Sequence, residues 1–157
     1  MPVAIIAIII LIPSLSAGAQ GLARIYVYAE RDTAARSWRP ISCDGTLVAK
    51  LKRGTFFAVN VAPGRHVLSD DRSVPAFVNV GEGEESFVRL DWVFHVGEPA
   101  TSILNIVRPN QARKDMIYLP YIDANKVLSA SVSKIDPRAP PPLRLKRRDE
   151  MKEPEGP

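Results

Sequence analysis

The stretch RPISCDGTLVAKLKRGTFFAVNVAPGRHVL, residues 39–68, predicts four strands joined by three tight turns. Asp44-Gly45 separates two strand-like runs, and both residue types tolerate the positive φ angles that a two-residue hairpin requires. Gly54 belongs to the second turn. Pro63-Gly64 forms the third, where proline presets φ and glycine accepts a positive value. The residues expected to shape these turns are Asp44, Gly45, Gly54, Pro63, Gly64 and, directly after the last turn, His66.

Apolar residues alternate along the strand predicted at 55–61, where Phe57, Val59 and Val61 share one face. The same period of two predicts strands at 23–28, 76–80, 86–94, 102–107 and 116–119. Both faces of 23–28 are apolar, which is typical of a central strand. Residues 123–132 allow one or two helical turns, with Asp123 at the N-cap. The chain is therefore expected to be all-β, a β-sandwich of about seven to eight mostly antiparallel strands.

Composition points to one domain. The chain has 157 residues, a length that suits a single hydrophobic core. Its net charge of +4 is modest, and acidic and basic residues are interspersed rather than gathered into a basic stripe. Nucleic acid is therefore not an expected partner.

The two ends of the sequence differ from the rest. Residues 1–19 carry no charge, contain a long apolar run and end in Ala17-Gly18-Ala19, which predicts a cleaved signal peptide and export to the periplasm or the extracellular space. An uncleaved N-terminal membrane anchor is the alternative. Residues 20–136 are then the β-sandwich domain. Residues 137–157 are rich in proline and charge and predict a disordered tail, either simply solvated or in weak contact with an anionic surface.

Cys43 is the only cysteine, so the chain forms no intrachain disulfide. Within a strand beside a turn, this thiol is expected to be buried as a small hydrophobe. The alternative is a functional thiol that pairs with another chain.

No pattern of catalytic or metal-binding residues stands out. His66 and His95 are the only histidines, and the two do not occur at any recognised short ligand spacing. The sequence has no nucleophile elbow, no zinc-protease motif and no phosphate-binding glycine loop. We therefore expect no catalytic residue, no cofactor and no metal, with His66 hydrogen-bonded to loop backbone. A small envelope hydrolase using His66 or His95 is the alternative.

Aromatic residues offer a route to ligand binding. Trp38 follows the first strand, and Tyr26 and Tyr28 alternate with its aliphatic residues. Rings that face outward from a sandwich can stack on sugars. The alternative for the two tyrosines is packing within the fold. An exposed edge strand would offer a further route, by pairing with a strand of a partner.

Several motifs resemble a family of exported bacterial domains of unknown function that is similar to PEGA-type modules, which are immunoglobulin-like or prealbumin-like β-sandwiches. The resemblance rests on RIYVY at 24–28, CDG at 43–45, GTFF at 54–57 and PGRH at 63–66. It implies a sandwich fold, an exported location and no catalytic residues. The resulting hypothesis is a noncatalytic structural or interaction module of the cell envelope, whose partner is an unknown protein or envelope polymer. A carbohydrate-binding module is the other reading of the same features.

Overall fold

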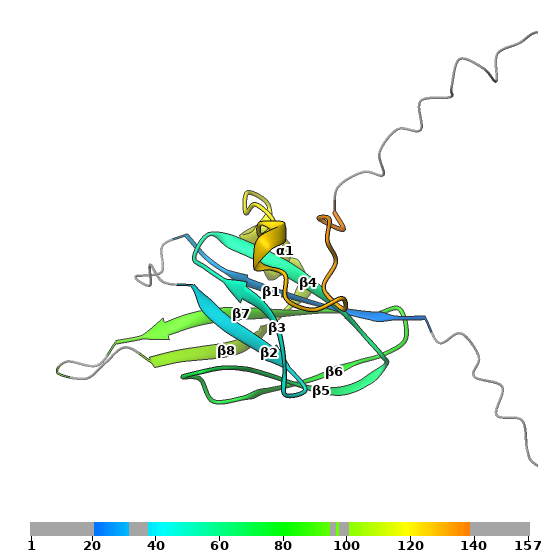
Figure 1. The fold of residues 1–157 in the computed structure, drawn as a ribbon, viewed down its shortest axis with the longest axis horizontal. Coiled ribbons are helices and arrows are strands. Elements are labelled where there is room, and N and C mark those ends of the chain that lie inside the picture. Colours follow the sequence, from blue (N-terminus) through cyan, green and yellow to red (C-terminus); the bar gives the residue numbers. More distant parts are fainter. Residues whose placement is uncertain (1–20, 32–37, 95–96, 98–100, 139–157) are drawn as a thin grey trace, which may run out of the picture.

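The computed structural model describes residues 21–31, 38–94, 97 and 101–138. Within these residues, eight strands form two four-stranded sheets packed face to face (Figure 1). Sheet A has the strand order β4-β1-β7-β8, and sheet B has the order β3-β2-β5-β6. The strands are β1 (Ala23–Ala29), β2 (Arg39–Cys43), β3 (Thr46–Leu51), β4 (Thr55–Val61), β5 (Gly64–Asp70), β6 (Ala76–Val80), β7 (Glu85–Val93) and β8 (Thr101–Val107). The predicted all-β sandwich is confirmed.

The main core lies between the sheets and follows the alternation seen in the sequence. Phe57, Val59 and Val61 of β4 all point into it. β1 is central, as its two apolar faces predict, and it pairs antiparallel with β4 but parallel with β7. The other four pairings between these strands are antiparallel.

A second apolar cluster covers the outer face of sheet A. It consists of Tyr26, Tyr28, Phe56, Ala58, Phe87, Ala112, Met116 and Leu119. The helix α1 (Pro109–Met116) supplies Ala112 and Met116, which lie one turn apart on its buried face. The strand predicted at 116–119 is therefore wrong, because Met116 ends a helix. Pro109 at the first helical position is the sequence feature that marks its start.

The segment after α1 runs along the edge strands β4 and β3. Phe56 N–H donates to the carbonyl of Pro120, and Asn60 N–H donates to that of Ser131. Leu128 N–H donates to the carbonyl of Val48 on β3. The segment contains the short 3₁₀ helix η1 (Ala124–Lys126), preceded by Asp123 as predicted, although the Asp123 side chain makes no capping bond. This flank of the sandwich is thus covered by the chain itself.

Arg138 fixes the end of this segment. Its guanidinium donates to the carbonyls of Met116 and Leu119 and lies 3.7 Å from the centre of the Phe56 ring. The packed structure therefore reaches two residues into the region predicted as a tail. The predicted signal peptide and the rest of the tail lie outside the described residues. No helix in the described ranges has the length and apolar character needed to cross a membrane.

Each of the three predicted turns contains a residue with positive φ, as its sequence predicts. Asp44 has a φ of 50° and Gly45 a φ of 78°, and the pair connects Cys43 directly to Thr46 across the hairpin. Gly54 and Gly64 also have positive φ, at 71° and 143°. The last value departs from the type II turn expected for Pro63-Gly64, but it too is a conformation that glycine adopts most readily.

Gly45→Ala should lower the free energy of unfolding by about 1–2 kcal/mol, the cost of placing a β-carbon in left-handed backbone. A β-carbon at this position meets no atom within 4 Å, so the loss would come from backbone conformation alone. Gly45→Asn is the matched control and should lose less, because asparagine tolerates positive φ. Urea denaturation of the three proteins measures both effects. Equal losses in the two variants would contradict the explanation.

Candidate functional site

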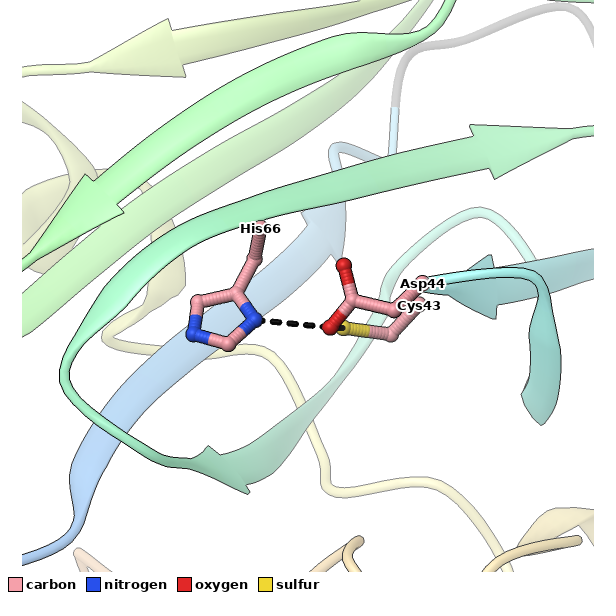
Figure 2. Close-up of side chains that lie close together, drawn as sticks. All are labelled: Cys43, Asp44 and His66. Carbon is pink, nitrogen blue, oxygen red and sulfur yellow. Dashed lines mark hydrogen bonds and ion pairs between the residues drawn. The ribbon is translucent and has the colours of Figure 1, made fainter.

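Three chemically reactive side chains meet where the β2–β3 hairpin turn lies against β5. Figure 2 shows Cys43 and Asp44 facing His66, which comes from the neighbouring strand. His66 Nδ1 lies 2.7 Å from Asp44 Oδ2, and Cys43 Sγ lies 3.8 Å from the same oxygen. The sulfur, one carboxylate oxygen and one ring nitrogen all lie within 4.8 Å of one another. We call Cys43, Asp44 and His66 the turn cluster.

Backbone groups hold the turn cluster in place. Asp44 Oδ1 accepts a hydrogen bond from Val67 N–H at 2.9 Å, and Asp44 N–H donates to the carbonyl of Val67. His66 Nε2 lies 2.7 Å from the carbonyl oxygen of Ala62, in the connection between β4 and β5. The bond from His66 to loop backbone was predicted from the sequence. Since β4 belongs to sheet A and β5 to sheet B, His66 links the two sheets at their crossover.

The protonation of His66 and Asp44 follows from these contacts. Burial by itself would lower the pKa of His66, but the hydrogen bonds to Asp44 and to Ala62 outweigh it and raise that pKa above its ordinary value. Burial would raise the pKa of Asp44. The hydrogen bonds from His66 and Val67 have the larger effect, so the pKa of Asp44 is lowered. The pair therefore favours a proton on His66 and a negative charge on Asp44.

The Cys43 thiol is a poor nucleophile where it lies. The residue is only 6% exposed, as the sequence predicts for a thiol in this strand. Burial raises the pKa of the thiol to about 12, and the charge of Asp44 and its hydrogen bond with Cys43 act in the same direction. Nucleophilic cysteines have a lowered pKa instead, so this geometry does not favour covalent catalysis.

Cys43 should react with a thiol reagent at pH 8 at least about 1,000-fold more slowly in the folded protein than in guanidinium chloride, because folding removes both access and thiolate. Ellman's reagent measures the two rates. Cys43→Ser gives the background. A comparable rate in both solvents, or a covalent dimer on a non-reducing gel that Cys43→Ser abolishes, would contradict the buried thiol.

The aromatic residues do not form a common surface. Tyr28 is fully buried and its hydroxyl donates to Asp115 Oδ2, while Tyr26 is 4% exposed and stacks on Phe87. The two tyrosines pack beneath α1, which is the alternative given for them from the sequence, and Tyr26 also lines a cleft of about 580 Å³ beside Phe87 and Arg113. Their alternation placed them on the outer face of sheet A, but the sequence analysis missed the helix that covers them.

Trp38 lies at a cleft of about 430 Å³, together with Arg31, Lys52, Arg53 and Asp123. The ammonium groups of Lys52 and Lys126 each lie 4.9 Å from the centre of its ring. The cleft therefore combines an aromatic ring with several positive charges. Trp38 lines this cleft and is partly exposed, whereas Tyr26 and Tyr28, the other two predicted ligand-binding residues, are buried.

The sequence analysis missed a buried ion pair within sheet B, at the side that meets Ser102 of sheet A. Arg39 of β2 and Asp70 of β5 lie 3.0 Å apart, and their side chains are almost completely buried. Ser102 of β8 donates a hydrogen bond to Asp70 at 2.7 Å. The position of Asp70 depends on the strand order that places β2 beside β5 and on the packing of sheet A, which brings Ser102 against it.

His95, the other histidine considered for catalysis, lies outside the described residues. Comparison of the chain with protein-family models, with curated proteins and with solved structures gives no match.

Proposed function

We propose that the chain is an exported, noncatalytic module of the cell envelope that binds a partner protein through the edge of sheet A formed by β8. The proposal rests mainly on the difference between the two flanks of the sandwich. On one flank, the segment after α1 pairs with β4 and β3. On the other flank, the described residues pair with the outer edge of β8 at one bridge, between Val74 and Ile103.

The composition of β8 supports pairing with another strand. Its seven residues, TSILNIV, include no charge and no proline, the usual devices that protect an edge strand. Ile106 is 57% exposed, and Val74 and Phe77 add further exposed apolar surface at or near the neighbouring edge strand β6. An uncharged edge of this kind is suited to strand addition, in which main-chain hydrogen bonds supply affinity.

A photo-crosslinking residue placed at Ile106 in the full-length protein tests the proposal in the native host cells. We expect discrete crosslinked products at this position and loss of those products when Ile103→Lys is added, because a charge on the edge strand opposes pairing. The matched control places the same crosslinker at Leu47, an exposed residue of the covered flank. Equal products from both positions, or none from Ile106, would overturn the proposed interface.

The Trp38 cleft supports a second candidate function, binding of an anionic envelope polysaccharide. A ring that stacks on sugars and lysines that pair with carboxylates would act together there. Polygalacturonate and neutral dextran serve as probes in a pull-down at low salt. We expect retention on polygalacturonate only, weakened by added salt and by Trp38→Ala. Unchanged retention of Trp38→Ala would remove this candidate.

A further inference from the structure

We propose that the turn cluster binds a divalent transition-metal ion, best matched by Zn²⁺, through Cys43 Sγ, Asp44 Oδ2 and His66 Nδ1. This inference is independent of the proposed partner interface. It concerns a different part of the sandwich, at the crossover between the two sheets.

The donor atoms suit zinc in type and in spacing. Thiolate, imidazole and carboxylate are the ligands that Zn²⁺ takes in proteins, with bond lengths of about 2.0–2.3 Å. Tetrahedral coordination at those lengths separates the ligand atoms by about 3.3–3.6 Å. The distances here are 2.7 Å from His66 Nδ1 to Asp44 Oδ2 and 3.8 Å from Cys43 Sγ to Asp44 Oδ2. The first value is shorter and the second longer than the required spacing, and Cys43 Sγ lies within 4.8 Å of His66 Nδ1, so movements of these side chains would create the site.

The surrounding backbone already orients two of the three ligands. A zinc-bound histidine usually donates its other ring N–H to a carbonyl or carboxylate, which fixes the nitrogen that faces the metal. The carbonyl of Ala62, 2.7 Å from His66 Nε2, is in that position and leaves Nδ1 directed at the cluster. Val67 N–H holds Asp44 Oδ1 in the same way and leaves Oδ2 facing His66 and Cys43.

The position of the turn cluster gives the ion an entry path and a fourth ligand. The Cys43 and His66 side chains are largely buried, whereas Asp44 is half exposed. A cleft of about 400 Å³ opens over them, lined also by Asn60, Ser129 and Ser131. Water from this cleft would complete a tetrahedral set of three protein ligands. On binding, the thiol proton and the proton that His66 shares with Asp44 pass to solvent, and the metal takes their place between the same atoms.

The competing explanation is that the three groups only clamp the hairpin to β5. A clamp needs the bond between His66 and Asp44 but makes no use of the Cys43 sulfur. Participation of the sulfur therefore distinguishes the two explanations.

The experiment uses the untagged full-length protein, freed of metal and kept reduced. Zn²⁺ is titrated by calorimetry, and Co²⁺ serves as a spectroscopic probe because its bond to a thiolate gives an intense near-ultraviolet charge-transfer band. We expect one ion per chain, the thiolate band with Co²⁺, and displacement of Co²⁺ by Zn²⁺. The His95→Ala variant is the control and should bind as the unaltered chain does.

Two conservative variants complete the test. Cys43→Ser should abolish the thiolate band, and both Cys43→Ser and Asp44→Asn should weaken Zn²⁺ binding more than about 100-fold, since even outer-shell partners account for 10–100-fold. Asparagine tolerates the positive φ of position 44, so the turn is preserved, and circular dichroism confirms folding. Absence of binding, absence of the thiolate band, or unchanged affinity in both variants would overturn the metal site.

Discussion

Asp70→Asn is expected to lower the free energy of unfolding by about 3–5 kcal/mol, the usual cost of removing one partner of a buried ion pair. Arg39 would keep its charge between the sheets after losing an acceptor that it contacts through both Nε and Nη2. Ser102 and the backbone N–H groups of Arg72 and Ser73 would lose a carboxylate acceptor as well. Urea denaturation at pH 7 measures the loss.

Asp71→Asn is the matched control for this prediction. Asp71 also contacts Arg39, at 2.6 Å, but its side chain is 51% exposed. Exposed ion pairs contribute about 0–1 kcal/mol, so the control should lose no more than that. Similar losses of unfolding free energy in Asp70→Asn and Asp71→Asn would contradict the explanation that burial of Asp70 makes its ion pair important for stability.

The difference in stability between the two proteins should also depend on pH. Burial would raise the pKa of Asp70, but the hydrogen bonds from Ser102, Arg72, Ser73 and Arg39 outweigh it and lower that pKa. A carboxyl whose pKa is lowered by folding stabilises the folded protein fully when the pH is above the pKa of the unfolded chain, about 3.9. This stabilisation is lost as the pH falls toward the pKa of the folded protein. The difference between the unaltered chain and Asp70→Asn should therefore shrink below about pH 4. A difference that grows on acidification would contradict the lowered pKa.

Phe56→Ala should cost about 3–5 kcal/mol of unfolding free energy, the range for truncation of a buried phenylalanine. Phe56 is fully buried on the outer face of sheet A, where it meets Tyr121 edge to face and carries the guanidinium of Arg138. Its loss would loosen the segment that covers the edge of β4. Trypsin should consequently cleave at Lys126 and Lys134 faster than in the unaltered chain under native conditions.

Phe77→Ala is the control, because the same truncation at a residue that is 53% exposed should cost less than about 1 kcal/mol. It should also leave cleavage at Lys126 and Lys134 unchanged. If Phe56→Ala loses stability without faster cleavage there, the cluster beneath α1 is not what holds the segment after the helix.

The strands of this protein are predictable because each has a local cause. Asp44-Gly45 has the backbone freedom for a two-residue turn, and the alternation in 55–61 separates the two apolar clusters on opposite faces of β4. The helix was missed because its sequence, PNQARKDM, is polar and short, and buries only two residues. It is stable through packing on sheet A rather than through its own helix propensity.

The candidate site was only half predictable. Asp44 and His66 were both singled out as turn residues, but their contact depends on β2 lying beside β5, which the sequence pattern does not specify. The same holds for Arg39 and Asp70, which pair because β2 lies beside β5 in sheet B. Trp38 was recognised as a binding candidate, whereas the lysines around it come together only in the folded chain.

The parallel pairing of β1 with β7 has a consequence for how the chain folds. Arg24 and Glu85 are neighbours in sheet A although about 60 residues of chain separate them, and such long-range pairing slows folding. β1 is therefore unpaired on one side until β7 has been synthesised. We therefore expect completion of sheet A to follow synthesis of β7, well after β1 has been made.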